Sequence, residues 1–368
     1  MSEPTIWVGL DVHKDSTTVA ILEGESMECE VLRLSSDLMQ VRRLFRRLSE
    51  RGMVRACYEA SGSGYVLQRV LSEDGFFCEV VAPSMIPRMP GDRRKTDRID
   101  AKMLARLYRS GHLVPVSVPT PEREALRRLV RLRTSTSRTV QDTKRRIAGI
   151  CLSQGLVFRG TRTLWSKKHR EWLNHLREEI QEGPMATVIR SELEQLEYLE
   201  TKLRSLDAEI EGYARRPPYR ESVEALCCLR GVKVLTAMVL ATEIGDIRRF
   251  PSAQALMAWT GLIPQERSSG NRERKGPITK TGNAHVRRIL VEAAWHHRHR
   301  AGAGLVLNRR RQGQSADIVA IAVKAQHRLA RKLYRLSLRK HQNKAVTAVA
   351  RELSGFVWAI MKAAPQPS

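Results

Sequence analysis

The sequence lacks the features of membrane-spanning, zinc-binding and disulfide-bonded proteins. No apolar run approaches the roughly 20 residues of a membrane-spanning helix, and the first residues do not have the layout of a signal peptide. We therefore expect a cytoplasmic protein with no membrane partner. The six cysteines include no C-x-x-C pair, so neither a zinc site nor a disulfide framework is indicated, and we expect reduced, buried thiols.

Acidic residues are scarce relative to basic ones. The 368 residues include 64 Lys and Arg but only 39 Asp and Glu, which gives a net charge of +25. Between residues 301 and 344 the only acid is Asp317. This excess exceeds what solubility requires and suits a partner with a dense line of negative charge, so we expect a nucleic-acid partner. The length allows two or three domains.

The N-terminal part has the apolar pattern of an α/β layer domain. The expected order is two strands within 5–22, a helix over 38–48, a strand over 53–60, a helix, and a strand over 76–82. Asp11 ends the first strand and Glu59 ends a later one. Sheets of this class place their sites at strand ends, so both carboxylates are candidate site residues.

A second pair of carboxylates follows at Asp97 and Asp100, three residues apart at the start of an expected helix. Residues at this spacing share one helix face. Alone, the pair fits either a solvated, salt-bridged first turn or half of a metal site. With Asp11 and Glu59 it provides the oxygen ligands that Mg²⁺ requires for phosphoryl transfer. His13 follows Asp11 in the polar break between the first two strands, where a role as a ligand is one alternative and a solvated side chain, the more common case for a single histidine in a polar turn, is the other.

The middle of the chain is expected to be helical. Residues 121–152 combine apolar helical spacing with many arginines, which indicates one packed face and one phosphate-facing face. A heptad seam of about three repeats follows, which indicates a coiled-coil arm. Pairing between chains and packing within one domain both remain open. The seam residues are Leu193, Leu196, Leu199, Leu203, Leu206 and Ile210.

The C-terminal part is expected to be mainly helical. A helix, a glycine turn and a helix over 226–244 resemble a helix-hairpin-helix element, which can present N–H groups to phosphate or simply pack as core. A polar, basic loop over 264–283 holds Ser268-Ser269-Gly270, and a helix follows over 284–297. A last helix over 345–362 should pack on the core. The candidate nucleic-acid-binding residues are Lys275, Lys280, Arg287 and Arg288.

In combination, these motifs resemble the DEDD-type insertion-sequence transposases of the IS110/IS1111 family, related to the Piv DNA invertases. The resemblance is carried by Gly9–Lys14, Tyr58–Ser61, Lys95–Ala101, Gly261–Pro264 and Ser269-Gly270. It implies an RNase H-like (RuvC-like) α/β domain at 1–118, a basic helix and coiled coil at 119–216, and a mainly α-helical transposase domain at 217–368.

The resemblance also implies a mechanism. Asp11, Glu59, Asp97 and Asp100 would hold Mg²⁺, and Ser269 would attack DNA to form a phosphoserine link, although Ser268 beside it leaves that choice open. Donor and target DNA and a non-coding bridge RNA would be the partners, and the protein would act as a homodimer or homotetramer.

Other functions fit parts of the same pattern. The same four acids could activate water in a structure-specific nuclease, and a basic scaffold could bind nucleic acid without catalysis. The only carboxylates of the serine loop are Glu266 and Glu273, so a serine nucleophile would need metal from the N-terminal acids. Otherwise Ser-Ser-Gly is a flexible turn in a phosphate-binding loop.

Overall fold

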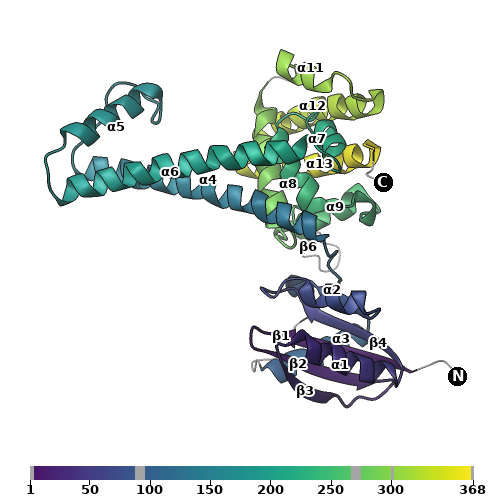
Figure 1. Ribbon diagram of the computed structural model, residues 1–368. Coiled ribbons are helices and arrows are strands. Elements are labelled where there is room, and N and C mark those ends of the chain that lie inside the picture. The colour runs from purple at the N-terminus through teal and green to yellow at the C-terminus, as the bar shows by residue number, and fades with distance from the viewer. Residues whose placement is uncertain (1–3, 88–95, 267–274, 300–301, 366–368) are drawn as a thin grey trace. The chain divides into compact units, whose positions relative to one another are not determined.

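The computed structural model describes residues 4–87, 96–266, 275–299 and 302–365. The chain forms two compact units, Met1–Thr120 and Pro121–Ser368. The first unit is a mixed α/β sheet domain and the second is helical (Figure 1). Among the described residues, no helix combines the length and apolar character that a membrane span requires.

The first unit is built on a five-stranded sheet with the strand order β3-β2-β1-β4-β5. Strands β1, β2 and β3 are antiparallel, whereas β4 and β5 run parallel to β1. The expected strands and first helix are confirmed. The elements are β1 Thr5–Val12, β2 Ser16–Glu23, β3 Glu30–Ser35, α1 Leu38–Ser49, β4 Met53–Glu59, α2 Val66–Glu73, β5 Phe77–Val81 and α3 Asp97–Arg109.

Both faces of this sheet are covered. On one face, residues such as Val8, Leu10 and Tyr58 pack with Phe45 of α1 and Leu71 of α2. On the other face, α3 packs through small residues on β1 and β2. Strand β3 was not expected from the sequence, because it is an exposed edge strand whose side chains are not buried. A sheet covered on both faces leaves its strand ends as the accessible place for a site.

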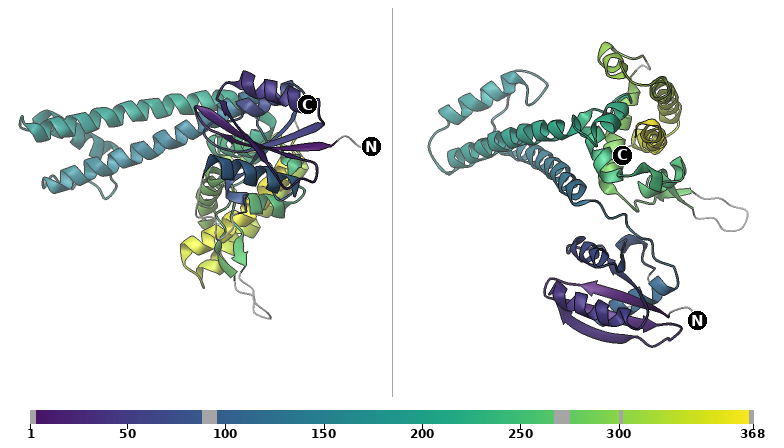
Figure 2. Two further views of the ribbon diagram at one scale, coloured as in Figure 1. Left: turned by 90° about the horizontal axis from the view of Figure 1, so that it is seen from below. Right: turned by 45° about the vertical axis from the view of Figure 1, so that its right-hand side comes forward.

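The second unit begins with three helices, α4 Pro121–Ser153, α5 Lys167–Glu179 and α6 Pro184–Ala214. Helices α4 and α6 lie side by side in all views (Figures 1 and 2). The heptad seam packs within the chain: Leu193 and Leu196 join Val140 and Ile147 of α4 in one buried cluster. The seam of α6 is therefore covered by α4 of the same chain.

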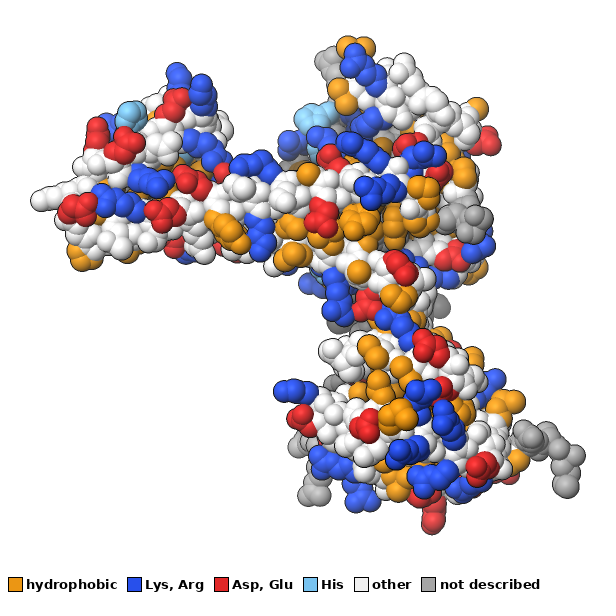
Figure 3. All heavy atoms as spheres, viewed as in Figure 1, with side chains coloured by type: hydrophobic (Ala, Val, Ile, Leu, Met, Phe, Trp, Pro, Cys, Tyr) orange, Lys and Arg blue, Asp and Glu red, His pale blue; other side chains and the backbone are white. Residues whose placement is uncertain are grey.

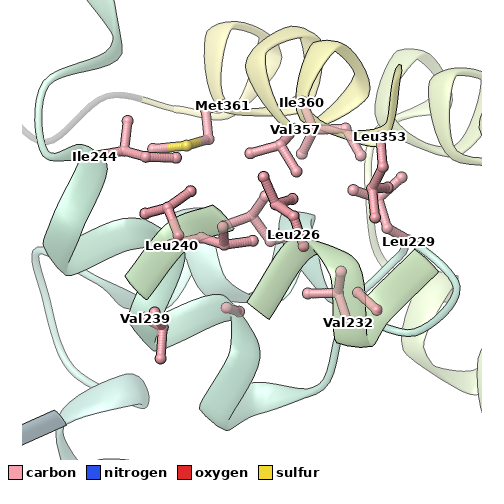
Figure 4. Packing of buried hydrophobic residues seen from close by; sticks show 14 of the residues in the cluster. Leu226, Leu229, Val232, Val239, Leu240, Ile244, Leu353, Val357, Ile360 and Met361 are labelled. Carbon is pink, nitrogen blue, oxygen red and sulfur yellow. The ribbon is translucent and has the colours of Figure 1, made fainter. Parts of the chain in front are cut away.

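The remaining elements pack around a helical core. Leu226, Leu229 and Leu240 face Leu353 and Val357 of the last helix (Figure 4). Of the helix, glycine turn and helix expected over 226–244, the turn and the second helix, α8, are present, but the first helix, α7, lies earlier than expected and ends at Leu226. The elements are α7 Arg220–Leu226, α8 Val234–Ile244, α9 Ala253–Trp259, β6 Pro264–Glu266, β7 Lys275–Ile278, α10 Ala284–Ala294, α11 Leu305–Arg311, α12 Ala316–Ser337 and α13 Gln342–Ala363.

Two expectations for this part change. The segment expected to be a loop over 264–283 contains an antiparallel pair, with Pro264 of β6 opposite Ile278 of β7. The helix expected over 284–297 ends at Ala294, and a 3₁₀ turn continues to Arg298. The expected terminal helix packs on the core as α13.

Candidate metal site and basic surfaces

The strand register brings Asp11 and Glu59 to neighbouring strand ends. Strands β1 and β4 are parallel with Leu10 opposite Tyr58, so the next residue on each strand is one of these acids. Two residues earlier, Gly9 and Cys57 face α3. Because side chains alternate along a strand, Asp11 and Glu59 emerge on that same face of the sheet.

Helix α3 brings the other two acids to this face. Thr96 caps the helix, and its hydroxyl accepts a hydrogen bond from the Ile99 N–H at 3.4 Å. Asp97 and Asp100 occupy the first turn, where the helix dipole favours negative charge. A Cβ at Gly9 would lie 2.3 Å from the Ala101 carbonyl oxygen. Glycine at this position therefore allows α3 to approach β1 closely, one turn after Asp97.

Three possible metal ligands meet here. His13 Nε2 lies 3.2 Å from Asp11 Oδ2 and 3.5 Å from Asp97 Oδ1. One ligand atom from each of the three residues lies within 4.8 Å of the others. The Asp11 side chain is 18% exposed, while those of His13 and Asp97 are about half exposed. Hence the cluster, which we call the Asp11 cluster, is open to solvent on one side.

The electrostatics of Asp11 favour a bound cation. Burial raises the pKa of Asp11, the charge and hydrogen bond of His13 oppose that rise, and the carboxylates of Asp97 and Asp100 add to it. Three carboxylates at one place repel each other, and a divalent cation relieves that repulsion. The donor set therefore fits a hard divalent cation. Asp100 acts on Asp11 through its charge, while Glu59 ends the adjacent strand; neither is part of the three-residue cluster.

The sequence did not single out His13 as a site residue. Its backbone N–H donates to the Ser16 carbonyl at 2.9 Å, which closes the tight turn between β1 and β2. The turn carries the imidazole back over the end of β1 to Asp11. The available signal was the Asp-x-His spacing at the end of a strand that leads into a short hairpin.

The four candidate nucleic-acid residues have different surroundings. Lys275 and Lys280 are exposed. Arg287 is partly buried and donates to the Thr260 carbonyl at 3.0 Å, so part of its hydrogen-bonding capacity is used inside the protein. Arg288 pairs with Glu292 and lines a hollow of 520 Å³ between α4 and α10, together with arginines of α4.

A second basic surface follows α12. Lys324, Arg328, Arg331 and Arg335 line a hollow of 620 Å³ on this helix. A neighbouring hollow of 770 Å³ lies between the β6–β7 pair, the C-terminal end of α12 and the N-terminal half of α13. It is lined by Lys275, Lys340, Lys344 and Arg351 among others. Leu336 borders both hollows, and we call the two together the α12 groove.

Helices α5 and α6 of the arm differ in charge from this groove. Residues 167–214 carry seven Lys and Arg but eleven Asp and Glu, whereas α12 carries five Lys and Arg and one Asp. Figure 3 shows red and blue side chains interspersed along the arm. Several of these acids pair with basic residues of the arm, as Glu200 does with Arg170 and with Lys144 of α4. The α12 groove is therefore better suited to a polyanion than α5 and α6.

One carboxylate of the second unit is buried among arginines. The Glu243 side chain is 1% exposed and accepts hydrogen bonds from Arg131 at 2.7 Å and from Asn283 at 2.8 Å. Burial raises its pKa, but the Arg131 hydrogen bond and the charges of Arg127 and Arg131 lower it further, so the net shift is downward. Asn283 also caps α10 through the Val286 N–H. Glu243 thus ties α4, α8 and α10 together.

Ser268 and Ser269 lie outside the described residues. On either side, β6 ends at Glu266 and β7 begins at Lys275. Thr279 N–H continues the pairing by donating to the Ile263 carbonyl at 2.9 Å. The serine segment is therefore flanked by a paired base that borders the α12 groove.

Comparison with known proteins finds transposase families over both parts of the chain. A family model described as "Transposase", for the DEDD transposases of IS110, matches residues 8–154, and one described as "Transposase IS116/IS110/IS902 family" matches residues 223–307. The chain is 37% identical to y4qE of Sinorhizobium fredii, named as a transposase, over 98% of the chain and 89% of that relative. It is 33% identical to the transposase for insertion sequence element IS1533 of Leptospira borgpetersenii, over 90% of the chain and 96% of that relative.

Proposed function

The chain belongs to the IS110/IS116/IS902 family of insertion-sequence transposases, enzymes that cleave and transfer DNA strands, and from this premise we propose how its residues carry out the reaction. The N-terminal unit holds Mg²⁺ at Asp11, Glu59, Asp97 and Asp100, and the helical unit supplies Ser269 as the nucleophile. The observation that carries this proposal is the convergence of Asp11, Asp97 and His13 at one open strand end.

The sheet supports an RNase H-like assignment for the N-terminal unit. An antiparallel β1–β2–β3 meander is extended by the parallel strands β4 and β5, with Asp11 next to the last residue of β1 and Glu59 the last residue of β4. We assign residues 1–118 to this domain, residues 119–216 to an arm and residues 217–368 to the transposase domain.

In this proposal the acids hold the cation, and the cation acts on the DNA. When bound, Mg²⁺ would polarise the scissile phosphate and stabilise the oxygen that leaves. Asp11, with its pKa raised by burial, and the two acids of α3 would hold the cation at the accessible end of strand β1. The excess of positive charge on the rest of the protein attracts the DNA phosphates but would not by itself cleave them.

Ser269 is proposed to conserve the energy of the broken bond. Its Oγ forms a bond to phosphorus, the P–O bond to one strand breaks, the serine releases its proton and the departing strand oxygen takes one up. A strand hydroxyl later attacks the phosphoserine and frees the serine. Because the acids and the serine belong to different units, this step requires that the two units meet, within one chain or between protomers of a homodimer or homotetramer.

Nucleic-acid binding is assigned to the basic surfaces. The α12 groove and Lys275 at its edge offer several cations to one phosphate backbone. Target and donor choice is proposed to be delegated to a bridge RNA, as the family resemblance implies. Protein purified from cells that carry its element should then bring down one discrete flanking RNA. Recovery of only heterogeneous RNA, with recombination unaffected by RNase, would show that the protein uses no guide RNA.

A plasmid recombination assay tests the proposed function. Asp11→Asn and Asp97→Asn should abolish recombination and strand cleavage while leaving nucleic-acid affinity nearly unchanged, because they weaken metal binding and not phosphate attraction. Asp15→Asn is the matched control, since Asp15 is an exposed acid of the same hairpin outside the cluster. Wild-type recombination by both cluster variants would refute the metal site. Cleavage without joined products would favour the hydrolytic nuclease.

A further inference from the structure

We propose that His13 Nε2 is a direct ligand of the metal at the Asp11 cluster, so that the site has a mixed nitrogen and oxygen donor set and binds Mn²⁺ in preference to Mg²⁺. This inference rests on the proposed function, because it concerns the same site. The four acids implied by the family resemblance contain only oxygen donors, and His13 adds a nitrogen to them.

The distances fit metal coordination. A divalent cation with ligands at about 2.1 Å in octahedral geometry places neighbouring donor atoms roughly 3.0 Å apart. His13 Nε2 lies 3.2 Å from Asp11 Oδ2 and 3.5 Å from Asp97 Oδ1. Both separations from His13 Nε2 are within a few tenths of an ångström of that spacing, and one ligand atom from each of the three residues lies within 4.8 Å of the others.

The position of His13 is set by backbone bonding and not by the carboxylates alone. The His13 N–H and the Ser16 carbonyl close the β1–β2 turn, and Asp11 pairs with Thr18 across the same hairpin. His13 follows Asp11 by two residues, and the turn brings its imidazole next to the Asp11 carboxylate. The His13 side chain is 53% exposed, so the ring can adjust to a cation without disturbing the core.

The chemistry of the donor predicts a preference among metals. Imidazole is a softer ligand than carboxylate and suits transition metals, whereas Mg²⁺ favours an all-oxygen set. With His13 as a ligand, Mn²⁺ should bind more tightly than Mg²⁺. Removing the imidazole should weaken Mn²⁺ binding by at least the roughly 10-fold that loss of an outer-shell partner causes, with a smaller effect on Mg²⁺.

Pulsed electron paramagnetic resonance of the full-length protein loaded with Mn²⁺ tests this directly. Nitrogen modulation from a coordinated imidazole should appear in the wild type and in His112→Asn, a control at an exposed histidine of the same unit. It should vanish in His13→Ala and in His13→Asp. The His13→Asp variant should still bind metal, through oxygen, and its relative affinity should move toward Mg²⁺.

The outcomes separate the inference from the proposed function. Mn²⁺ that binds, is lost in Asp11→Asn and shows no nitrogen modulation in the wild type would overturn the role of His13 and leave the metal site standing. Modulation that persists in His13→Ala would also overturn it. A wild-type protein that binds no Mn²⁺, or binds it equally after Asp11→Asn, would overturn both.

Discussion

Replacing Gly9 by alanine should impair catalysis through the position of α3. The added Cβ would lie 2.3 Å from the Ala101 carbonyl oxygen and 2.5 Å from the Ala105 nitrogen, both backbone atoms, whereas ordinary contacts begin at 3.4 Å. Helix α3 must therefore move by about 1 Å away from β1. Overpacking of this kind costs roughly 1–3 kcal/mol of unfolding free energy, which a typical domain survives.

The displaced helix carries Asp97 and Asp100 in its first turn. A misplacement of about 1 Å at a reacting centre costs on the order of 100-fold in rate. We therefore expect Gly9→Ala to cleave DNA about 100-fold more slowly and to bind Mn²⁺ more weakly, while circular dichroism shows a folded protein. Gly62→Ala is the control, because a Cβ there meets no atom within 4 Å. Gly9→Ala with the cleavage rate of Gly62→Ala would refute the reasoning.

Three further predictions concern the helical unit. Glu243→Gln should lower the free energy of unfolding by about 1.5–3 kcal/mol in denaturant titrations, because it removes the charge that accepts hydrogen bonds from Arg131 and neutralises the partly buried Arg127. The exposed Glu194→Gln should cost less than about 1 kcal/mol. Burial lowers the pKa of His297 from 6.5 to about 4, so the unfolded state binds a proton first as pH falls. With about 1.36 kcal/mol per pKa unit, stability should drop by about 3 kcal/mol between pH 7 and pH 4, and a wild-type pH slope in His297→Phe would contradict this. Lys344→Gln in the α12 groove should reduce the slope of log nucleic-acid affinity against log salt concentration by about 0.9. An equal effect from Lys168→Gln on α5 would show that the groove is not the preferred binding surface.

The sequence allowed prediction of those features that local pattern determines. Alternating apolar residues locate the end of β1, and therefore the position of Asp11. The pair Asp97 and Asp100 predicts a helix with acids in its first turn. The family resemblance is confirmed, as is a mixed α/β N-terminal region followed by helices.

Features that depend on tertiary contacts could not be predicted. The heptad seam shows that α6 needs an apolar partner, but nothing in the pattern identifies α4, which is more than 30 residues away along the chain. His13 reaches Asp11 and Asp97 only because the hairpin turn folds it back. Glu243 is the single charged residue within the apolar helix α8, a signal for a buried ion pair, yet its partners lie on other helices.

The central claim is that a serine of the helical unit attacks DNA with the help of metal held by the N-terminal acids. Trapping of a covalent complex tests it most directly, with a DNA substrate nicked near the scissile phosphate. The adduct should survive denaturation, require Mg²⁺ and Asp11, persist in Ser268→Ala and disappear in Ser269→Ala. Mass spectrometry should place the nucleotide on the peptide that contains Ser269. Cleavage without any adduct, or an unchanged adduct yield in Ser269→Ala, would contradict the account.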